Sequence, residues 1–193
     1  MFGLGTTISK AAVYSAAAIR GVAGYVRDNL KLYMPYTFAD KVKFVGTGST
    51  YFTTDDYIED TSVSGFPSGN TFTISAWIKV DAAHDYSANH FPILRRDEAT
   101  NNFIFLISNS TPKIGLIRYG AETKKGDTTI TDDVWHHVVV SVNNLVATFY
   151  LDGSNDGEQT FTGNFAHANE MRIGQYVSDF ANGYMKNIAI WTR

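Results

Sequence analysis

The residues of this chain that could carry acid–base chemistry are its 19 acidic residues and its five histidines, since it has no cysteine. Hydrolysis of a glycosidic bond requires two carboxyl groups held about 5–10 Å apart across that bond. The paired acids Asp55-Asp56 and Glu59-Asp60 are adjacent in sequence, and adjacent residues on a strand point to opposite faces. We therefore interpret the acids as solvated loop residues, and we predict no catalytic residue.

The adjacent histidines His136 and His137 are candidates for a metal site or a catalytic base. Because neighbours on a strand lie on opposite sides, the two rings cannot both bind one ion. The sequence also lacks the Gly-x-Ser-x-Gly turn that presents the nucleophile of many serine hydrolases. We predict that both histidines are structural, packed and hydrogen-bonded near Trp135, and that the chain is not an enzyme.

The composition indicates one β-rich domain with an appendage. The chain has 193 residues, of which 44% are hydrophobic and 14% aromatic, enough for one substantial core. Its net charge of −3 argues against a basic nucleic-acid-binding surface. No apolar run approaches the ~20 residues of a membrane span, and residues 1–5 lack the basic start of a signal peptide. We therefore expect neither nucleic acid nor a membrane as partner.

Residues 6–29 are the best helix candidate in the chain, although Gly21 and Gly24 would each cost a helix about 1 kcal/mol. Its apolar stripe, which we predict to anchor the chain or to mediate self-association, consists of Ile8, Ala12, Ile19, Val22 and Val26. Three interpretations stay open: an amphipathic helix that lies on the rest of the chain or on a partner, a short self-associating bundle, or an arm that orders only on binding.

The strongest strand signal is the β-branched and aromatic run 135–142. Because it is apolar on both faces, we predict an internal strand that is covered on both sides. A second strand is expected over 147–151. It ends at Asp152-Gly153, a pair that accepts the positive φ angles of a tight hairpin.

The motif Asp133-x-Trp135-His136-His137-Val138-x-Val140, followed by residues 149–153 (Phe-Tyr-Leu-Asp-Gly), resembles the laminin-G-like branch of the concanavalin A-like jelly rolls. Residues 72–79 resemble the first core strand of that family, and residues 180–191 resemble its closing strand. The resemblance implies an all-β fold, an antiparallel two-sheet jelly-roll sandwich over residues 30–193, preceded by a short helical arm over 1–29.

Between the expected strands, turn-forming and polar residues predict loops at 55–70, 120–127, 154–158 and 175–182. Residues 72–80 alternate between apolar residues and more polar or mixed ones, which predicts a strand. Residues 103–108 form a continuous apolar run, which we predict to be a strand buried on both faces.

The resemblance also indicates where a site would lie. The glycanase branch carries Glu-x-Asp-x-Glu on one strand, and this sequence has no such run. Calcium-binding relatives place an aspartate just before the strand that matches 103–108. This chain has Asn101-Asn102 there, with Asp97-Glu98 a few residues earlier, so we expect no metal and no cofactor, although calcium is possible.

A lectin-type site combines an aromatic platform with planar polar groups from neighbouring loops. If the family layout holds, two loops meet at one rim and supply the glycan-binding candidates His84, Asp85, Tyr86, His90, Tyr176 and Asp179. The alternative is that these are ordinary loop residues.

The opening residues Met1–Lys10, with the arm that follows, resemble virion proteins of tailed phages. That resemblance implies a non-enzymatic structural protein, such as a capsid decoration or cement subunit that assembles in the host cytoplasm and resides in the virion. Its partners would be the major capsid protein and copies of itself, as a homotrimer or capsid array, and cell-surface glycans are further candidates. The alternative is a glycan-binding adhesion module of a cellular protein or of a phage tail appendage.

Overall fold

The computed structural model describes residues 30–33, 43–45, 49–53, 55–61, 69–97, 103–118, 122–165 and 170–192. The predicted helix over 6–29 and its apolar stripe lie outside these residues. Within the described ranges, no helix has the length and apolar character needed to span a membrane.

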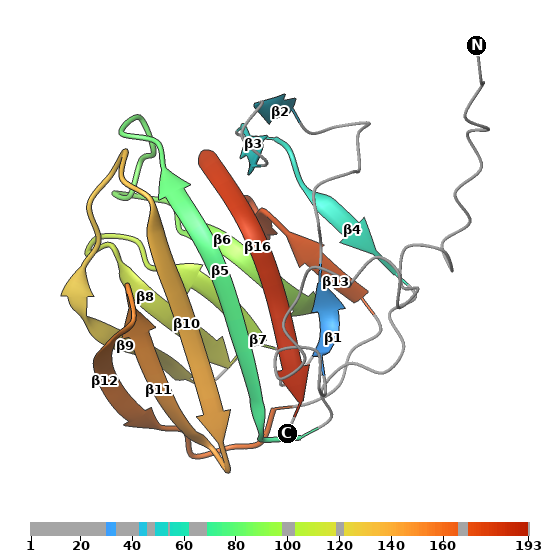
Figure 1. Cartoon of the computed structure of the whole chain (residues 1–193), viewed down its shortest axis with the longest axis vertical. Coiled ribbons are helices and arrows are strands. Elements are labelled where there is room, and N and C mark those ends of the chain that lie inside the picture. Colours follow the sequence, from blue (N-terminus) through green and yellow to red (C-terminus); the bar gives the residue numbers. More distant parts are fainter. Residues whose placement is uncertain are drawn as a thin grey trace.

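The described residues form two antiparallel sheets that pack face to face, with the larger sheet toward the viewer in Figure 1. The strands of the larger sheet are, in spatial order, β12 (Ser154–Thr160), β11 (Val146–Leu151), β10 (His136–Asn143), β5 (Phe72–Val80), β16 (Gly183–Thr192), β3 (Ser49–Phe52) and β2 (Lys43–Val45), with β1 (Leu30–Tyr33) also on β16. The strands of the smaller sheet are β4 (Ile58–Asp60), β13 (Glu170–Ile173), β6 (Phe91–Asp97), β7 (Phe103–Ile107), β8 (Lys113–Arg118) and β9 (Glu122–Thr129). A separate hairpin joins β14 (Gln175–Tyr176) to β15 (Asp179–Phe180). This arrangement agrees with the predicted two-sheet sandwich.

The core lies between the two sheets and is built by alternation along the strands. On β5, Ile74, Ala76 and Ile78 are fully buried, while the residues between them face outward. Eight phenylalanines of the described residues fill the space between the layers, six from the strands and two from the segment after β12: Phe52, Phe72, Phe91, Phe103, Phe105, Phe149, Phe161 and Phe165. Strand β7 is buried on both faces, as predicted.

Strand β10 is internal, as predicted, because it pairs with β5 on one side and β11 on the other. The expectation that it is covered on both sides is wrong. Val138 and Val140 are buried in the core, whereas His137 and Val139 on the other face stay partly exposed. The apolar outward residues of β10 therefore contribute to a surface of the molecule.

The predicted Asp152-Gly153 hairpin is present: both residues have positive φ, 51° and 84°, and Leu151 pairs directly with Ser154. Residues 122–127 and 154–158, which were expected in loops, lie instead in the strands β9 and β12, and short strands also occur within 55–70 and 175–182. β4, β9 and β12 lie at sheet edges, where polar residues are common, so their composition resembles that of loops.

The two edge strands β9 and β12 meet and close one side of the sandwich. Asp156 of β12 is buried, and its Oδ1 accepts a hydrogen bond of 2.8 Å from the backbone N–H of Thr128 in β9. A Cβ on Gly126 would collide with the Asp156 carboxylate, so the absence of a side chain at Gly126 makes this contact between the sheets possible.

We predict that Gly126→Ala lowers the free energy of unfolding by about 1–3 kcal/mol, because the buried carboxylate of Asp156 cannot move aside cheaply. The same substitution should cost less than half as much in an Asp156→Ala background, which removes the carboxylate that the new Cβ would meet first. Urea unfolding of the four chains of this cycle measures the coupling. Equal costs of Gly126→Ala in both backgrounds would contradict this explanation of the glycine.

Candidate functional site

The acidic residues of the described part of the chain serve mainly in ion pairs and backbone hydrogen bonds. Glu59 and Glu170 both bind Arg172, at 2.6 Å and 2.7 Å. The two acids of β12 point in different directions, because a bulge at Gly157 separates them: Asp156 is buried, whereas Glu158 is exposed. The interpretation of Glu59-Asp60 as solvated loop residues is wrong, because both lie in β4 and Glu59 is held in an ion pair across the sheet.

His136 bridges two turns at the start of β10. Its Nδ1 lies 2.8 Å from Asp152 Oδ2, and its Nε2 accepts a hydrogen bond from the backbone N–H of Thr131, which assigns the proton to Nδ1. The other carboxylate oxygen of Asp152 accepts from the backbone N–H of His137 at 2.8 Å. Burial alone would raise the pKa of Asp152, but the hydrogen bonds from His136 and His137 outweigh burial and leave the pKa lowered.

His137 contacts a different set of residues, on the outer face of the larger sheet. Its Nε2 lies 2.8 Å from Ser75 Oγ, and its ring stacks on Trp77 with the ring centres 5.1 Å apart. Burial lowers the pKa of His137, so the neutral ring is favoured. The two adjacent histidines therefore bond to different elements, which fits their predicted structural role.

Two of the six predicted glycan-binding residues face the core. His84 is only 8% exposed and meets Tyr86 and Phe91 edge-on, with ring centres 4.7 Å and 5.6 Å apart. Burial lowers the pKa of His84, while burial and the nearby Asp132 raise the pKa of Tyr86. Asp85 is exposed, and its carboxylate accepts hydrogen bonds from the backbone N–H and hydroxyl of Ser87. His84 and Tyr86 thus pack as core residues.

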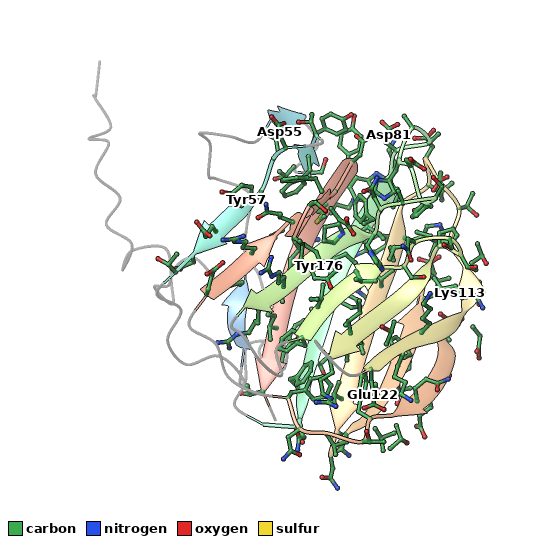
Figure 2. All side chains as sticks on the ribbon, turned by 180° about the vertical axis from the view of Figure 1, so that it is seen from behind. Asp55, Tyr57, Asp81, Lys113, Glu122 and Tyr176 are labelled. Carbon is green, nitrogen blue, oxygen red and sulfur yellow. The ribbon has the colours of Figure 1, made fainter. Side chains whose placement is uncertain are left out.

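The structure brings His90, Tyr176 and Asp179 together, so the two predicted loops do meet. Asp179 Oδ2 accepts from the backbone N–H of His90 and lies 2.8 Å from its Nδ1, and the His90 ring lies 5.8 Å from that of Tyr176. Tyr176 lies over the middle of the smaller sheet in Figure 2, packed against Ile104 and Leu106. These contacts hold the β14–β15 hairpin on the sheet.

A second group of aromatic residues lies on the outer face of the larger sheet. The rings of Tyr51 on β3 and Tyr184 on β16 are 4.6 Å apart, and Lys79 Nζ of β5 lies 5.0 Å from the centre of the Tyr184 ring. Trp135 precedes β10, and its ring lies 6.3 Å from that of Tyr184.

Lys186 of β16 connects this group to Trp77. Its Nζ lies 4.1 Å from the centre of the Trp135 ring and 5.3 Å from that of Trp77. Together with His137, which stacks on Trp77, these side chains form one partly exposed surface. We call it the aromatic face; its residues are Tyr51, Trp77, Lys79, Trp135, His137, Tyr184 and Lys186.

The register of the strands explains why these residues meet. Tyr184 pairs with Tyr51 on one side and Lys79 on the other, and Trp77 pairs with Lys186 and His137. The sequence predicted a structural role for His137 near Trp135 but gave no sign of the face. The outward positions of residues 72–80 were visible as an alternating pattern, but their neighbours depend on pairings between distant segments.

The side chains of the aromatic face are suited to binding a ligand whose ring has an apolar side and a polar edge. Tryptophan and tyrosine side chains present an apolar ring surface and a polar edge, and so suit a ligand with apolar and polar sides, such as a sugar. Planar polar groups beside the rings could fix its orientation. Within the described residues, no group of three or more acidic or histidine side chains could hold a metal ion. The side chains of 97–102, where calcium was considered, lie outside that part.

Comparison with known proteins identifies relatives of the fold. Residues 51–193 match the family model of the concanavalin A-like lectin/glucanases superfamily. This match confirms the laminin-G-like and concanavalin A-like resemblance seen in the sequence. No match was found among curated proteins.

Solved structures with the same fold include domain 4 of AbnA, an extracellular GH43 arabinanase from Geobacillus stearothermophilus, in complex with arabinotriose. It aligns with a TM-score of 0.61 and 16% identity over 78% of this chain and 74% of that one. The receptor-binding domain of botulinum neurotoxin D aligns with a TM-score of 0.67 and 14% identity over 87% of this chain, which spans 50% of that domain. A heptameric SAP-like pentraxin from Limulus polyphemus aligns with a TM-score of 0.58 and 16% sequence identity, over 74% of each chain.

We predict that the free energy of unfolding decreases as the pH falls from about 7 to 5. The pKa values of His84 and His137 lie below the ordinary value in the folded chain, so the unfolded chain binds more protons in this range. Their stabilising contribution is complete above about pH 6.5 and is lost on acidification. Urea unfolding at several pH values measures the slope, which should be smaller in His137→Gln. An unchanged slope in that variant would contradict the assignment.

Proposed function

The chain belongs, over residues 51–193, to the concanavalin A-like lectin/glucanases superfamily, and on this basis we propose that it is a non-catalytic carbohydrate-binding domain. The observation that supports the proposal most strongly is the aromatic face. It presents four aromatic rings and two lysines on one side of the larger sheet. The rigid core strands beneath hold these side chains in place, which favours binding of a ligand on a prepared surface.

The distribution of acids supports binding over hydrolysis. A glycosidase needs one carboxyl group as acid and a second as base or nucleophile, both facing the same sugar bond. Here Asp152 forms hydrogen bonds with His136 and with the backbone of His137. Glu59 and Glu170 both form ion pairs with Arg172. These ion pairs and hydrogen bonds link strands and turns of the sandwich, which is a structural role.

The structural relatives support a sugar ligand as a hypothesis. The AbnA domain was solved with arabinotriose bound, so this fold accommodates a sugar ligand in at least one relative. At 16% identity that likeness concerns the fold alone, and the proposal for this chain therefore rests on its own side chains. Two of the predicted rim residues, His84 and Tyr86, pack inward, which favours the aromatic face as the site.

A finer proposal concerns the biological setting. The resemblance of Met1–Lys10 to tailed-phage virion proteins supports a role as a structural subunit of a phage particle, anchored by residues 1–29, with the jelly roll outward. The sandwich is compatible with that role and equally with an adhesion module of a cellular protein or of a tail appendage. The sequence of residues 1–29 is the sole support for the virion setting.

We predict that Trp135→Ala weakens glycan binding about tenfold or more, because partly exposed aromatic residues dominate such contacts. Trp135 contacts Tyr184 and Lys186 on the surface, so the fold should persist. Tyr150→Ala is the matched control, since Tyr150 lies on the same side of the sheet but beyond β10, opposite Val139.

A glycan array followed by calorimetry measures this effect, with circular dichroism to check folding. Binding that survives Trp135→Ala but is lost in Tyr150→Ala would show that the glycan binds outside the aromatic face. If the folded chain binds no glycan on a broad array, the proposed function is wrong.

We predict that deletion of residues 1–29 abolishes attachment to phage particles while leaving glycan binding intact, because the two roles reside in different parts of the chain. Sedimentation of the truncated and full-length proteins with particles measures attachment. Normal assembly of the truncated protein would contradict the anchoring role.

A further inference from the structure

The two lysines of the aromatic face occupy neighbouring positions on adjacent strands. Lys79 of β5 pairs with Tyr184 of β16, and two residues along, Trp77 pairs with Lys186. Lys79 and Lys186 are therefore diagonal neighbours on the same side of the sheet. Diagonal neighbours in an antiparallel pair are about 7–8 Å apart, close enough for both side chains to reach one small group.

Aromatic rings hold both ammonium groups against the sheet. Lys79 Nζ lies over Tyr184, and Lys186 Nζ lies over Trp135 and near Trp77. A surface lysine normally extends its charge into water and loses considerable freedom when it is fixed. Cation–π contacts of this kind stabilise the inward position and reduce the entropy that a ligand would have to overcome.

Neither lysine forms an ion pair with an acid among the described residues. The carboxylates that form ion pairs there bind other partners: Glu59 and Glu170 bind Arg172, Glu122 binds Arg118 and Lys124, and Asp152 and Asp179 bind histidines. Asp81 lies at the rim of the face beside the Tyr51 hydroxyl, where it helps to raise the pKa of Tyr51 after the larger effect of burial. Two like charges side by side are unfavourable unless an anion joins them.

This concentration of positive charge stands out in a chain whose net charge is −3. A neutral sugar would need the rings but would leave two ammonium groups without a counter-charge. A carboxylate or sulfate between the lysines would instead form charge-assisted hydrogen bonds with both of them.

We propose that the aromatic face selects acidic saccharides, with a carboxylate or sulfate group held between Lys79 and Lys186 while a sugar ring stacks on Trp135 or Trp77. This inference rests on the proposed function and adds the ligand class. The rings supply contact area, and the two lysines supply the preference for a negatively charged sugar over its neutral counterpart.

The test uses the full chain and an array of matched glycan pairs that differ only in the acidic group. Suitable pairs are oligogalacturonate and its methyl ester, a sialylated glycan and its asialo form, and a sulfated oligosaccharide and its unsulfated form. We expect at least one acidic member to bind about tenfold more tightly than its neutral twin. Its affinity should fall as the salt concentration rises.

Three double variants assign the preference to this pair of lysines. Lys79→Gln/Lys186→Gln should weaken binding of the acidic member about tenfold more than binding of its neutral twin, so that the preference is lost. Lys79→Arg/Lys186→Arg keeps both charges and the cation–π contacts, so it should retain the preference. Lys113→Gln/Lys125→Gln, on β8 and β9 of the smaller sheet, removes the same net charge elsewhere and should have no effect.

Neutral glycans that bind as tightly as their acidic twins would overturn the acidic preference and leave the carbohydrate-binding proposal standing. A preference that survives Lys79→Gln/Lys186→Gln would overturn the assignment to this pair. Absence of binding to every glycan would instead refute the proposed function itself, so the two failures are distinguishable.

Discussion

The pairing register of the three strands β5, β10 and β16 is the constraint on which the rest of the structure depends. Side chains alternate along each strand, so the register decides both which residues fill the core and which share the outer face. In the observed register, Trp77 lies opposite His137 and Lys186 on the outer face. The alternate residues Ile74 and Ile78 therefore point into the sandwich and are fully buried. A slip by one residue would bury Lys79 and expose Ile78, at a cost that the fold could not tolerate.

The two histidines of the Trp-His-His motif and the Asp-Gly turn hold this register. Asp152 closes the β11–β12 hairpin and binds both the ring of His136 and the backbone N–H of His137, which ties the start of β10 to the turn. His137 then stacks on Trp77 across the strand pair. The motif therefore acts as a framework that also places Trp135 on the aromatic face. Residues that look catalytic in the sequence serve here to position a surface.

Sequence reasoning predicted the parts of the fold that are encoded by local patterns. The apolar run of β7, the alternation of β5 and the Asp152-Gly153 turn were all visible in the residues themselves. The polar edge strands β9 and β12 were missed, because their residues face water on one side and closely resemble loop sequences. The register shift at Gly157, which accompanies the burial of Asp156 against β9, depends on the partner strand β11 and has no clear local signal.

The candidate site was harder to predict for the same physical reason. His84 and Tyr86 looked like rim residues, yet His84 packs against Phe91 and Tyr86 packs against His84, because the core extends under their loop. The aromatic face combines residues from four separate segments, which pairing alone brings together. The most direct test of binding at this face is an NMR titration that follows the indole N–H signals of the three tryptophans as an oligosaccharide is added. The signals of Trp77 and Trp135 should shift, while that of Trp191, at the opposite end of the same sheet face, stays in place. Shifts at Trp191 alone, or none at Trp77 and Trp135 at a saturating glycan concentration, would contradict it.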